Sequence, residues 1–548
     1  MSNIFEKPGR YWHTIRYLRP AQIINRILRR FKRINIDLSP ASETRKKKSE
    51  WVKPPMREPR MLGESEFFFL NESHIILQKS DWNNEKNSKL WLYNLHYFDD
   101  LNATLANQRY DWHCSYLKRW IMENPVGFGN GWEPYPSSLR IVNWIKWGLA
   151  GNGTEDEWLH SLTLQIRYLS KNLETHLLGN HLFANAKALM FAGLFFTGRE
   201  ANVWYETALR IIKVELPEQV LNDGGNFELS TMYHEIFLED LLDIVNMHRT
   251  MGMAIPAEIE EYIPNMMYWL SAMCHPDGEI SFFNDAAIGI APSVSELFAY
   301  ASRLDFEFSK PDKGLTELPD SGYSRIETDD AVVLIDQAAI GPDYLPGHAH
   351  ADTLSFEMSI FQKRVIINSG TSVYGTSIDR QQERSTATHS TVVLDGENSS
   401  EVWGGFRVAR RARVFNKENK ENSGVIVSAC HDGFKRLSGN PVHCRTWDFS
   451  NSSLVIHDKI SGYGSHKAEV IFHFHPEVVL DKIHGDGVTL LVEGNLIDIT
   501  CVGDGKLRVE PSTYHPEFGL SIDNKKLVYS VKFNLSTEVE TKISWREI

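Results

Sequence analysis

The chain has 548 residues, of which 42% are hydrophobic and 24% charged, and its formal net charge at pH 7 is −13. This composition excludes a disordered or collagen-like chain and predicts a globular protein of about two to four domains. The sequence contains no run of about 18 apolar residues, so no transmembrane helix is predicted. The five cysteines are far apart and include no Cys-x-x-Cys pair, which argues against a disulfide framework and a zinc knuckle and favours a reducing compartment.

The first 50 residues are strongly basic. They hold 13 Lys/Arg against 4 Asp/Glu, so the rest of the chain carries a net charge of −22. Within Ala21–Ile36, apolar residues at helical spacing are mixed with arginines, which predicts a basic amphipathic helix. Either this helix touches an anionic membrane surface or a partner, or the arm packs on its own acidic body. Nucleic acid is not an expected partner, because no recognised binding module accompanies the arm.

Helical periodicity dominates the chain before residue 318, and short strand-like runs follow it. We therefore predict an α+β protein with a basic arm and linker (1–60), a helical domain (61–318) and a domain of antiparallel sheets packed as a sandwich (319–548). The predicted helices span 137–149, 158–173, 181–196, 204–216, 230–251 and 257–273. The predicted strands span 331–335, 353–361, 364–367, 391–394, 424–429, 453–457, 468–475, 488–492 and 527–533.

Three clusters in the helical half are candidate functional groups. Asn180 and His181 lie at the predicted start of a helix, where N–H groups and the helix dipole favour a bound anion. Tyr233 lies near the start of a later helix, between Glu228 and His234. For any single residue, helix capping or packing between helices explains the pattern equally well. The third cluster mixes aromatic and hydrogen-bonding groups, as a carbohydrate-binding wall does: Trp132, Glu133, Tyr135, Arg140 and Asn143.

The run from Gly347 to Glu357 holds two histidines and an aspartate within five positions. On a strand, residues two apart share a face, so His348 and His350 would face one site. Histidine transfers protons near neutral pH and is also the commonest metal ligand, so the pair could hold a metal, move protons, or divide the two roles. His389 precedes a predicted strand and is placed to be a third imidazole.

Arginines and one tryptophan follow in the β half. Arg384, Trp403 and Arg407 precede the run Arg410-Arg411-Ala412-Arg413. These arginines would give an acidic protein a local basic groove for a polyanionic ligand. For a single arginine, a strand position facing solvent is the simpler interpretation.

Four motifs, in this order, resemble those of the heparinase II/III group of polysaccharide lyases. The resemblance spans most of residues 90–548 and implies an incomplete (α/α) toroid followed by an antiparallel β-sandwich, with the active cleft between them. The implied reaction is β-elimination at a uronic acid residue. The motifs are Gly179-Asn180-His181, Glu228 to His234, Gly347 to Phe356, and Arg384 to Thr391.

The resemblance also implies roles for single residues. Asn180 and His181 would bind the uronate carboxylate, which must be neutralised before the C5 proton can leave. Tyr233 would serve as base and also as acid, and His348 would be the second acid/base group.

Some relatives hold a structural metal near this site, and the resemblance places its ligands at His350, Asn368 and His389. Asn368 stands where metal-binding relatives have aspartate, and a neutral amide oxygen is a weaker zinc ligand. We therefore expect no required cofactor and leave open a structural divalent metal, zinc or calcium.

The expected function is a lyase that cleaves an acidic polysaccharide or oligosaccharide. The alternative is a uronate C5-epimerase of surface-polysaccharide biosynthesis, because both reactions begin by removing the C5 proton. Residues 1–9 show no apolar segment of a secretory signal, so we expect a cytoplasmic protein whose basic arm contacts the inner membrane, which favours the alternative. A catalytically silent glycan-binding protein is a third interpretation. The sequence leaves the oligomeric state open.

Overall fold

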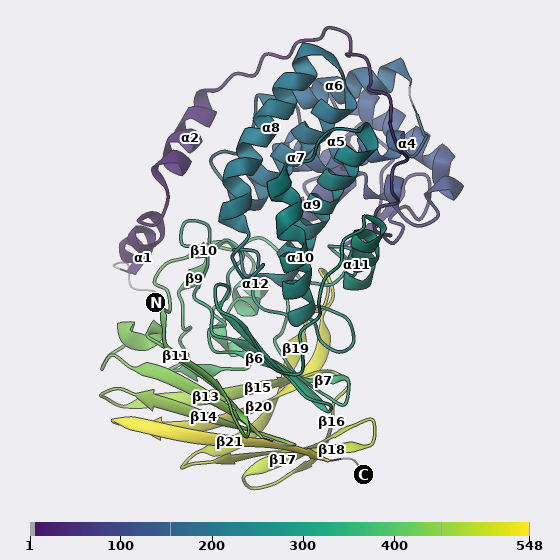
Figure 1. The fold of residues 1–548 in the computed structure, drawn as a ribbon. Helices are drawn as coiled ribbons and strands as arrows, with labels where there is room; N and C mark the ends of the chain where they lie inside the picture. Colours follow the sequence, from purple (N-terminus) through teal and green to yellow (C-terminus); the bar gives the residue numbers. More distant parts are fainter. Residues whose placement is uncertain (1–5, 154, 451, 547–548) are drawn as a thin grey trace.

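The computed structural model describes residues 6–153, 155–450 and 452–546, and in it a helical part precedes a part made of large sheets (Figure 1). None of the helices within these ranges is both long and apolar enough to cross a membrane. The α-helices are α1 (Glu6–Ile15), α2 (Pro20–Phe31), α3 (Lys89–Tyr97), α4 (Tyr110–Glu123), α5 (Pro134–Leu149), α6 (Asp156–Ser170), α7 (Gly179–Phe195), α8 (Gly198–Gln219), α9 (Thr231–Met251), α10 (Ala257–Ala272), α11 (Val294–Arg303) and α12 (Ile378–Glu383).

The helices from α3 to α11 form the incomplete (α/α) toroid, and α7 lies at its centre. Nearly every side chain of α7 is buried, because its sequence is apolar on all sides. Helix α7 packs on α5, α8 and α9. Gly193 permits the close approach of α8, since a Cβ atom there would lie 2.7 Å from the backbone nitrogen of Tyr205.

Two antiparallel sheets pack face to face and form the sandwich. The nine-stranded sheet has the order β19-β20-β15-β7-β6-β5-β4-β3, with β8 paired to β15, and the eight-stranded sheet has the order β11-β12-β13-β14-β21-β18-β17-β16. In the core, Phe356 of the first sheet packs on Trp447 of the second sheet and on Phe472 of its own sheet. The strands are β1 (Glu66–Phe69), β2 (Glu72–Ile75), β3 (Gly314–Leu318), β4 (Tyr323–Glu327), β5 (Ala331–Asp336), β6 (Phe356–Ile360), β7 (Lys363–Ile367), β8 (Val392–Leu394), β9 (Val402–Trp403), β10 (Arg407–Val408), β11 (Val414–Glu421), β12 (Val425–His431), β13 (Val442–Ser450), β14 (Ser453–Ser461), β15 (His466–Phe474), β16 (Val479–Ile483), β17 (Gly487–Val492), β18 (Asn495–Val502), β19 (Lys506–Tyr514), β20 (Ile522–Phe533) and β21 (Ser536–Arg546).

The predicted fold class is confirmed, and the differences are local. Strands β13 and β21 were missed because only alternate residues face the core, so their outward polar residues dilute the hydrophobic signal. The limit predicted at residue 318 falls at the end of β3, which already belongs to the nine-stranded sheet. The predicted strand at 353–361 begins only at Phe356, so the two histidines of the Gly347–Glu357 run lie in a loop.

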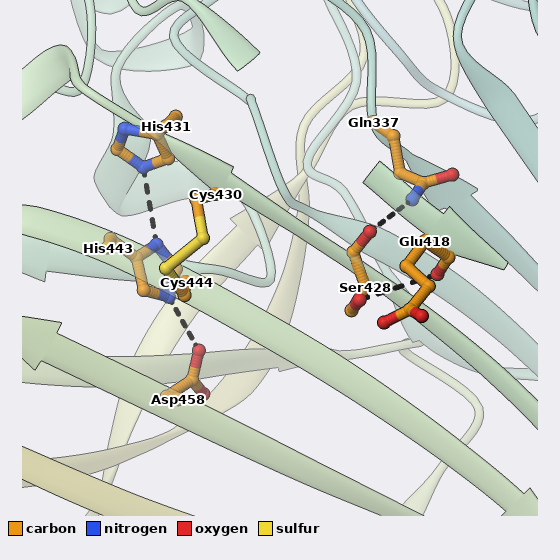
Figure 2. The surroundings of a disulfide bond; sticks show 8 residues. All are labelled: Gln337, Glu418, Ser428, Cys430, His431, His443, Cys444 and Asp458. Carbon is orange, nitrogen blue, oxygen red and sulfur yellow. Dashed lines mark hydrogen bonds and ion pairs between the residues drawn. A yellow bond between two sulfur atoms is a disulfide. The ribbon is translucent and has the colours of Figure 1, made fainter. Parts of the chain in front are cut away.

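One pair of cysteines corrects the prediction of no disulfide framework. Cys430 on β12 lies directly opposite Cys444 on β13, and the two form a disulfide (Figure 2). Their separation of 14 residues hid this pairing, because only the hairpin brings the two positions together. Disulfides are typical of oxidising compartments, so the cysteines no longer support a reducing one, and the location of the protein stays a prediction.

Candidate active site

A cleft with a volume of about 1810 Å³ opens between the toroid and loops of the β part. Helices α5, α7 and α9 contribute one wall, and the loops around residues 348, 374 and 515 contribute the other. Six of the residues predicted for the site line this cleft: Tyr135, Asn143, Asn180, His181, Tyr233 and His348.

A buried aspartate that the sequence prediction missed positions both histidines of the loop. The Nδ1 atom of His348 lies 2.9 Å from one carboxylate oxygen of Asp285, and the Nε2 atom of His350 lies 2.8 Å from the other. Asp285 also accepts two hydrogen bonds from the buried guanidinium of Arg380. These partners hold the pKa of Asp285 well below its usual range although burial opposes ionisation.

The backbone of Asp285 ties this site to the start of α9. Its N–H donates to the carbonyl of His348, and its carbonyl accepts from the hydroxyl of Ser230, which also caps α9. Because Tyr233 lies in the first turn of that helix, the loop and the tyrosine are held by the same residue. The two histidines therefore point to different places: His348 lines the cleft, and His350 is buried behind it.

Tyr233 meets His348 at the cleft wall. The two rings have centroids 4.0 Å apart, and the hydroxyl of Tyr233 lies 3.0 Å from that of Tyr374. Burial raises the pKa of Tyr233 well above 10, and the neighbouring Tyr374, Tyr135 and Glu228 raise it further. The phenol is therefore protonated at neutral pH and can donate a hydrogen bond or a proton.

The start of α7 presents Asn180 and His181 to the cleft. Asn180 donates to the hydroxyl of Tyr135 at 3.4 Å, and His181 Nδ1 lies 3.1 Å from the carboxylate of Glu174. Two buried carboxyl groups of the chain lie near this helix start, because the N–H of Asn180 opposes the upward pKa shift of Glu228 and the N–H of Gly179 opposes that of Glu215. These carboxyl groups compete with a substrate anion for the helix N-terminus, so the side chains of Asn180 and His181 are the better candidates to bind one.

Glu228 is buried beside the reacting groups. One of its oxygens has no hydrogen-bond partner among the described residues and lies 3.5 Å from His348 Nε2. Burial raises the pKa of Glu228, while the nearby His348 opposes the shift. His348 is thus placed between two carboxyl groups, Asp285 at Nδ1 and Glu228 at Nε2.

The predicted metal ligands are buried behind the cleft. His350 Nδ1 and His389 Nε2 face each other at 3.1 Å, while His389 Nδ1 donates to the carbonyl of Ser385 and His350 Nε2 binds Asp285. The ring nitrogens bound to Asp285 and Ser385 carry the protons, so His350 Nδ1 and His389 Nε2 direct their lone pairs toward the space between them. Two histidines that bind one metal are arranged in this way.

The third predicted ligand is already engaged. The amide of Asn368 accepts a hydrogen bond from the backbone N–H of Ser390 and donates to Ser355. Within the described part of the chain, no three His, Cys, Asp or Glu side chains form a group that could hold a metal. The two histidines therefore fit a metal, and a third strong ligand is not supplied by those residue types.

Several residues predicted to contact substrate do not line the cleft, because their side chains are buried in the fold. Trp132 packs on Trp120, and Arg140 donates to the carbonyls of His96 and Gly131. The other two are His234, which stacks on Trp269, and Arg384, which donates to the carbonyl of Ala349.

Three others lie outside the cleft lining. Glu133 is half-buried and binds Tyr93 and Lys89. Trp403 and Arg407 stack on each other in the β9–β10 hairpin. The predicted basic groove is also wrong, because Arg411 and Arg413 both bind Asp343 and none of the arginines from 384 to 413 lines the cleft.

Three residues of the site were missed by the sequence prediction: Asp285, Tyr374 and Arg380. Asp285 follows the apolar Phe282-Phe283 pair after one residue, Asn284, and an acidic residue so close to that apolar pair is the one local signal that could have identified it. Tyr374 and Arg380 lie in ordinary polar sequence, so no local pattern distinguishes them.

Residues 65–306 match the family described as Heparinase II/III N-terminus, and residues 310–546 match the family described as Heparinase II/III-like, C-terminal. The two matches span most of the chain in the predicted order, so this chain belongs to the heparinase II/III-like family. A heparin-sulfate lyase of Bacteroides stercoris is 25% identical over 59% of the chain and 50% of the relative. A heparin-sulfate lyase of Pedobacter heparinus is 24% identical over 51% of the chain and 47% of the relative. The chain thus spans about half the length of these curated relatives.

Solved structures share the fold. A crystal structure of heparinase III superimposes with a TM-score of 0.71 at 17% identity, covering 85% of this chain and 79% of that one. Heparan sulfate lyase HepC from Pedobacter heparinus gives a TM-score of 0.60 at 18% identity, covering 96% and 88%.

Proposed function

We propose that the protein is a polysaccharide lyase that cleaves a uronate-containing glycan by β-elimination. The observation that carries this proposal is the meeting of Tyr233 and His348 at the wall of a large cleft, with Asn180 and His181 lining the same cleft. Membership of the heparinase II/III-like family and two relatives named heparin-sulfate lyase support the same reaction class.

The first requirement is to neutralise the uronate carboxylate, because the C5 proton is otherwise poorly acidic. Asn180 offers its amide N–H groups, and His181 offers a positive charge. Burial lowers the pKa of His181, but the Glu174 carboxylate outweighs burial, so the net shift is upward. The imidazole is therefore cationic over a wider pH range than a free histidine.

The second requirement is a base and an acid at the reacting bond. His348 donates Nδ1–H to Asp285, and its Nε2, which lies 3.5 Å from the Glu228 carboxyl, is the nitrogen left to take the C5 proton. The electron pair of the C5–H bond forms the C4=C5 double bond, and the C4–O4 bond breaks. Tyr233, which its environment keeps protonated, gives its phenolic proton to the leaving oxygen. The family resemblance implied that Tyr233 serves as base and also as acid; its raised pKa favours the role of acid.

The experiment mixes the purified protein with a panel of uronate glycans and follows the ultraviolet absorbance of the C4=C5 bond. Tyr233→Phe should lower the rate by about 100-fold or more without changing the melting temperature. Tyr205→Phe, which removes a hydroxyl outside the cleft lining, is the control and should keep full activity. Full activity of Tyr233→Phe would refute the assigned roles.

A uronate C5-epimerase is the second candidate, because the same two groups can remove a C5 proton and return it. The reaction is distinguished by running it in D₂O. Deuterium at C5 without new absorbance identifies epimerisation and contradicts the lyase proposal. If neither signal appears with any uronate glycan, both proposals fail.

We also propose that a divalent metal, when present, is structural and is held by His350 and His389. Asn368 would be at most a weak third ligand, through the second lone pair of an amide oxygen that already accepts from Ser390. Imidazole ligands favour zinc over calcium. The metal would fix the loop behind His348 without touching the substrate. Metal analysis should find one zinc per chain in the wild type and none in His389→Ala; equal content in both would refute the site.

A further inference from the structure

The cleft is lined by more acidic than basic side chains. Among the described residues that line it, 11 are Asp or Glu and 6 are Lys or Arg. The acidic ones are Glu58, Glu72, Asp99, Glu235, Glu239, Asp240, Glu279, Glu296, Asp379, Glu383 and Glu517, and the basic ones are Arg57, Arg60, Lys89, Lys146, Lys187 and Lys526.

The lining cations are already neutralised by the chain. Lys187 lies 2.6 Å from the carboxylates of both Asp240 and Asp243, and Lys146 lies 2.5 Å from Asp243. Both lysines are buried. This network at the floor of the cleft holds its positive charges among fixed carboxylates, so they are not free for a ligand.

The remaining lining cations have partners as well. Arg57 binds Glu239, Lys89 lies 2.9 Å from Glu133, and Lys526 lies 3.8 Å from Glu510. Arg60 donates to the carbonyl of Gly289. Recognition of sulfate groups depends on Arg and Lys side chains that can point at the anion, and this cleft offers no cluster of them among its described residues.

We propose, resting on the lyase function above, that the substrate is a uronate glycan without sulfate groups. The site provides neutralising groups for one carboxylate, at Asn180 and His181. Burial raises the pKa of Glu235 well above its usual range, so that group adds no charge. Other lining carboxylates, such as Glu58, Asp99 and Asp379, have no Lys or Arg partner among the described residues and leave an excess of negative charge elsewhere in the cleft. A chain with several sulfates per disaccharide would be repelled along the cleft, whereas an unsulfated chain carries few charges for that excess to repel. Aromatic rings such as Tyr93 and Tyr97 line the cleft and offer surfaces for neutral sugar faces.

The test compares unsulfated and sulfated forms of the same backbone, for heparan and for chondroitin, by calorimetry and by ultraviolet absorbance. The unsulfated form should bind about tenfold tighter or more at low salt, and added salt should strengthen binding of the sulfated form by screening repulsion. Tighter binding of the sulfated form, with a loss of affinity in salt, would overturn the inference, as would equal binding.

The two proposals fail in different ways. Cleavage of sulfated glycans alone would keep the lyase function and overturn the charge inference. Tighter binding of unsulfated glycans without any new absorbance would support the charge inference and overturn the lyase function. No binding of any of the four glycans would overturn both.

A charge-reversal variant sharpens the test. Glu58 is exposed at the cleft and has no ion-pair partner among the described residues, so Glu58→Lys should fold normally. It should raise the affinity ratio of sulfated to unsulfated glycan several-fold, and Glu58→Gln should give an intermediate value. Glu307→Lys, also exposed but outside the cleft lining, is the matched control and should leave the ratio unchanged. An unchanged ratio in Glu58→Lys would contradict the inference.

A different observation concerns the basic arm. Helix α2 lies on the outside of the molecule beside the helical part (Figure 1), and its polar side chains hold it there. Gln22 donates to the carbonyl of Tyr344, Asn25 donates to the carbonyl of Thr175, and Arg29 lies 2.6 Å from His176. The arm therefore does pack on the body, as one of the two interpretations of the sequence expected, but its apolar residues take no part in these contacts.

The apolar face of α2 points to solvent. Its side chains are between 41% and 79% exposed, and Trp12 on α1 is 65% exposed. Exposed cations flank this face: Arg26, Arg30, Lys32 and Arg33. The apolar residues are Ile23, Ile24, Ile27, Leu28 and Phe31.

We infer, independently of the cleft, that this face of α2 binds an anionic phospholipid bilayer. Exposed apolar residues next to cations complement both the acyl chains and the negative headgroups, and a tryptophan nearby suits the interface between them. A second copy of the chain would bring its own cations against these and would be repelled.

Sedimentation with vesicles tests this inference. The protein should sediment with phosphatidylcholine vesicles that contain phosphatidylglycerol and stay in solution with phosphatidylcholine alone. The double variant Leu28→Glu/Phe31→Glu should stay in solution with both, and it should fold normally because both side chains are exposed. Leu535→Glu, an equally exposed leucine of the β part, is the control and should sediment as the wild type does.

Two outcomes would overturn the inference that α2 binds an anionic bilayer. One is undiminished sedimentation of the double variant. The other is a concentration-dependent dimer that the double variant loses, which would assign the face to a second copy of the chain.

Discussion

Two buried clusters of this molecule are built from the same parts. Asp285 is bound by the guanidinium of Arg380 and by two histidines, of which His350 also contacts His389. In the sandwich, Asp458 is bound by the guanidinium of Arg445 and by His443, whose second nitrogen lies 3.2 Å from His431 (Figure 2).

The difference between the clusters lies in access. Asp458, Arg445 and both histidines of the second cluster are fully buried between the sheets, next to the disulfide. In the first cluster, the aspartate is equally buried, but His348 reaches the cleft and meets Tyr233. An Asp–Arg–His network is therefore a structural device in both places, and it serves chemistry only where one imidazole meets solvent beside a second proton-transfer group.

The largest effect is expected at Tyr233, which distinguishes the two clusters because it has no counterpart in the sandwich cluster. Tyr233→Phe should reduce turnover by about 100-fold or more, because general acid catalysis is worth that much, without lowering the stability of the fold. Turnover and the urea midpoint are measured on the same sample. A large loss of stability would mean that the hydroxyl is structural.

Removing the charge of either aspartate tests what the clusters share. Asp285→Asn and Asp458→Asn each leave a buried guanidinium without its counter-ion, which should cost about 3 kcal/mol or more of the free energy of unfolding. Only Asp285→Asn should also lower turnover, because His348 loses the partner of its Nδ1. Equal loss of turnover in both variants, measured under conditions where both are folded, would refute the distinction.

Replacing one histidine in each cluster should have opposite effects on turnover and on stability. His348→Gln should lower turnover with little change in stability, since this side chain is partly exposed in the cleft. His443→Gln should cost about 1–3 kcal/mol, because it leaves buried partners unsatisfied, and should not change turnover. Urea unfolding and initial rates on both variants give the comparison, which fails if His443→Gln alone affects turnover.

The smallest effect is a difference in pH dependence between His181 and His443. The pKa of His181 is raised, since Glu174 and Glu228 outweigh burial and Arg29, so its contribution to stability is full below about pH 6.5 and is lost as the pH rises through the folded value. The pKa of His443 is lowered by burial and by Arg445 despite Asp458, so its presence should destabilise the fold as the pH falls below about 6.5.

Urea unfolding of the wild type, His181→Gln and His443→Gln between about pH 5 and pH 9 measures these contributions, and their slopes should have opposite signs. Slopes of the same sign would show that one of the two assigned charge states is wrong.

The layout of the molecule could be predicted from local patterns. The helical periodicity that ends before residue 318 and the short apolar runs after it reflect side-chain burial on elements of different period, so they identified a helical part followed by a sandwich. That the helical part is a toroid was implied by the family resemblance. Residue types also identified part of the site: Asn180, Tyr233 and His348, which were predicted as site residues, all line the cleft. Strands with polar outer faces, such as β21, were missed because about half of their residues face away from the core and are polar.

Tertiary contacts decided the rest. Asp285 and Tyr374 both contact His348, and Arg380 binds Asp285, but no spacing in the chain indicates that these residues meet. The arginines expected to form a basic groove are instead bound to Asp343 or buried. The amphipathic pattern of α2 established that one face is apolar, but it took the docked position of the arm to show that this face is the exposed one. Sequence patterns record which side chains avoid water and which chemistry is available; which groups meet, and which charges remain free, depends on contacts between residues far apart in the chain.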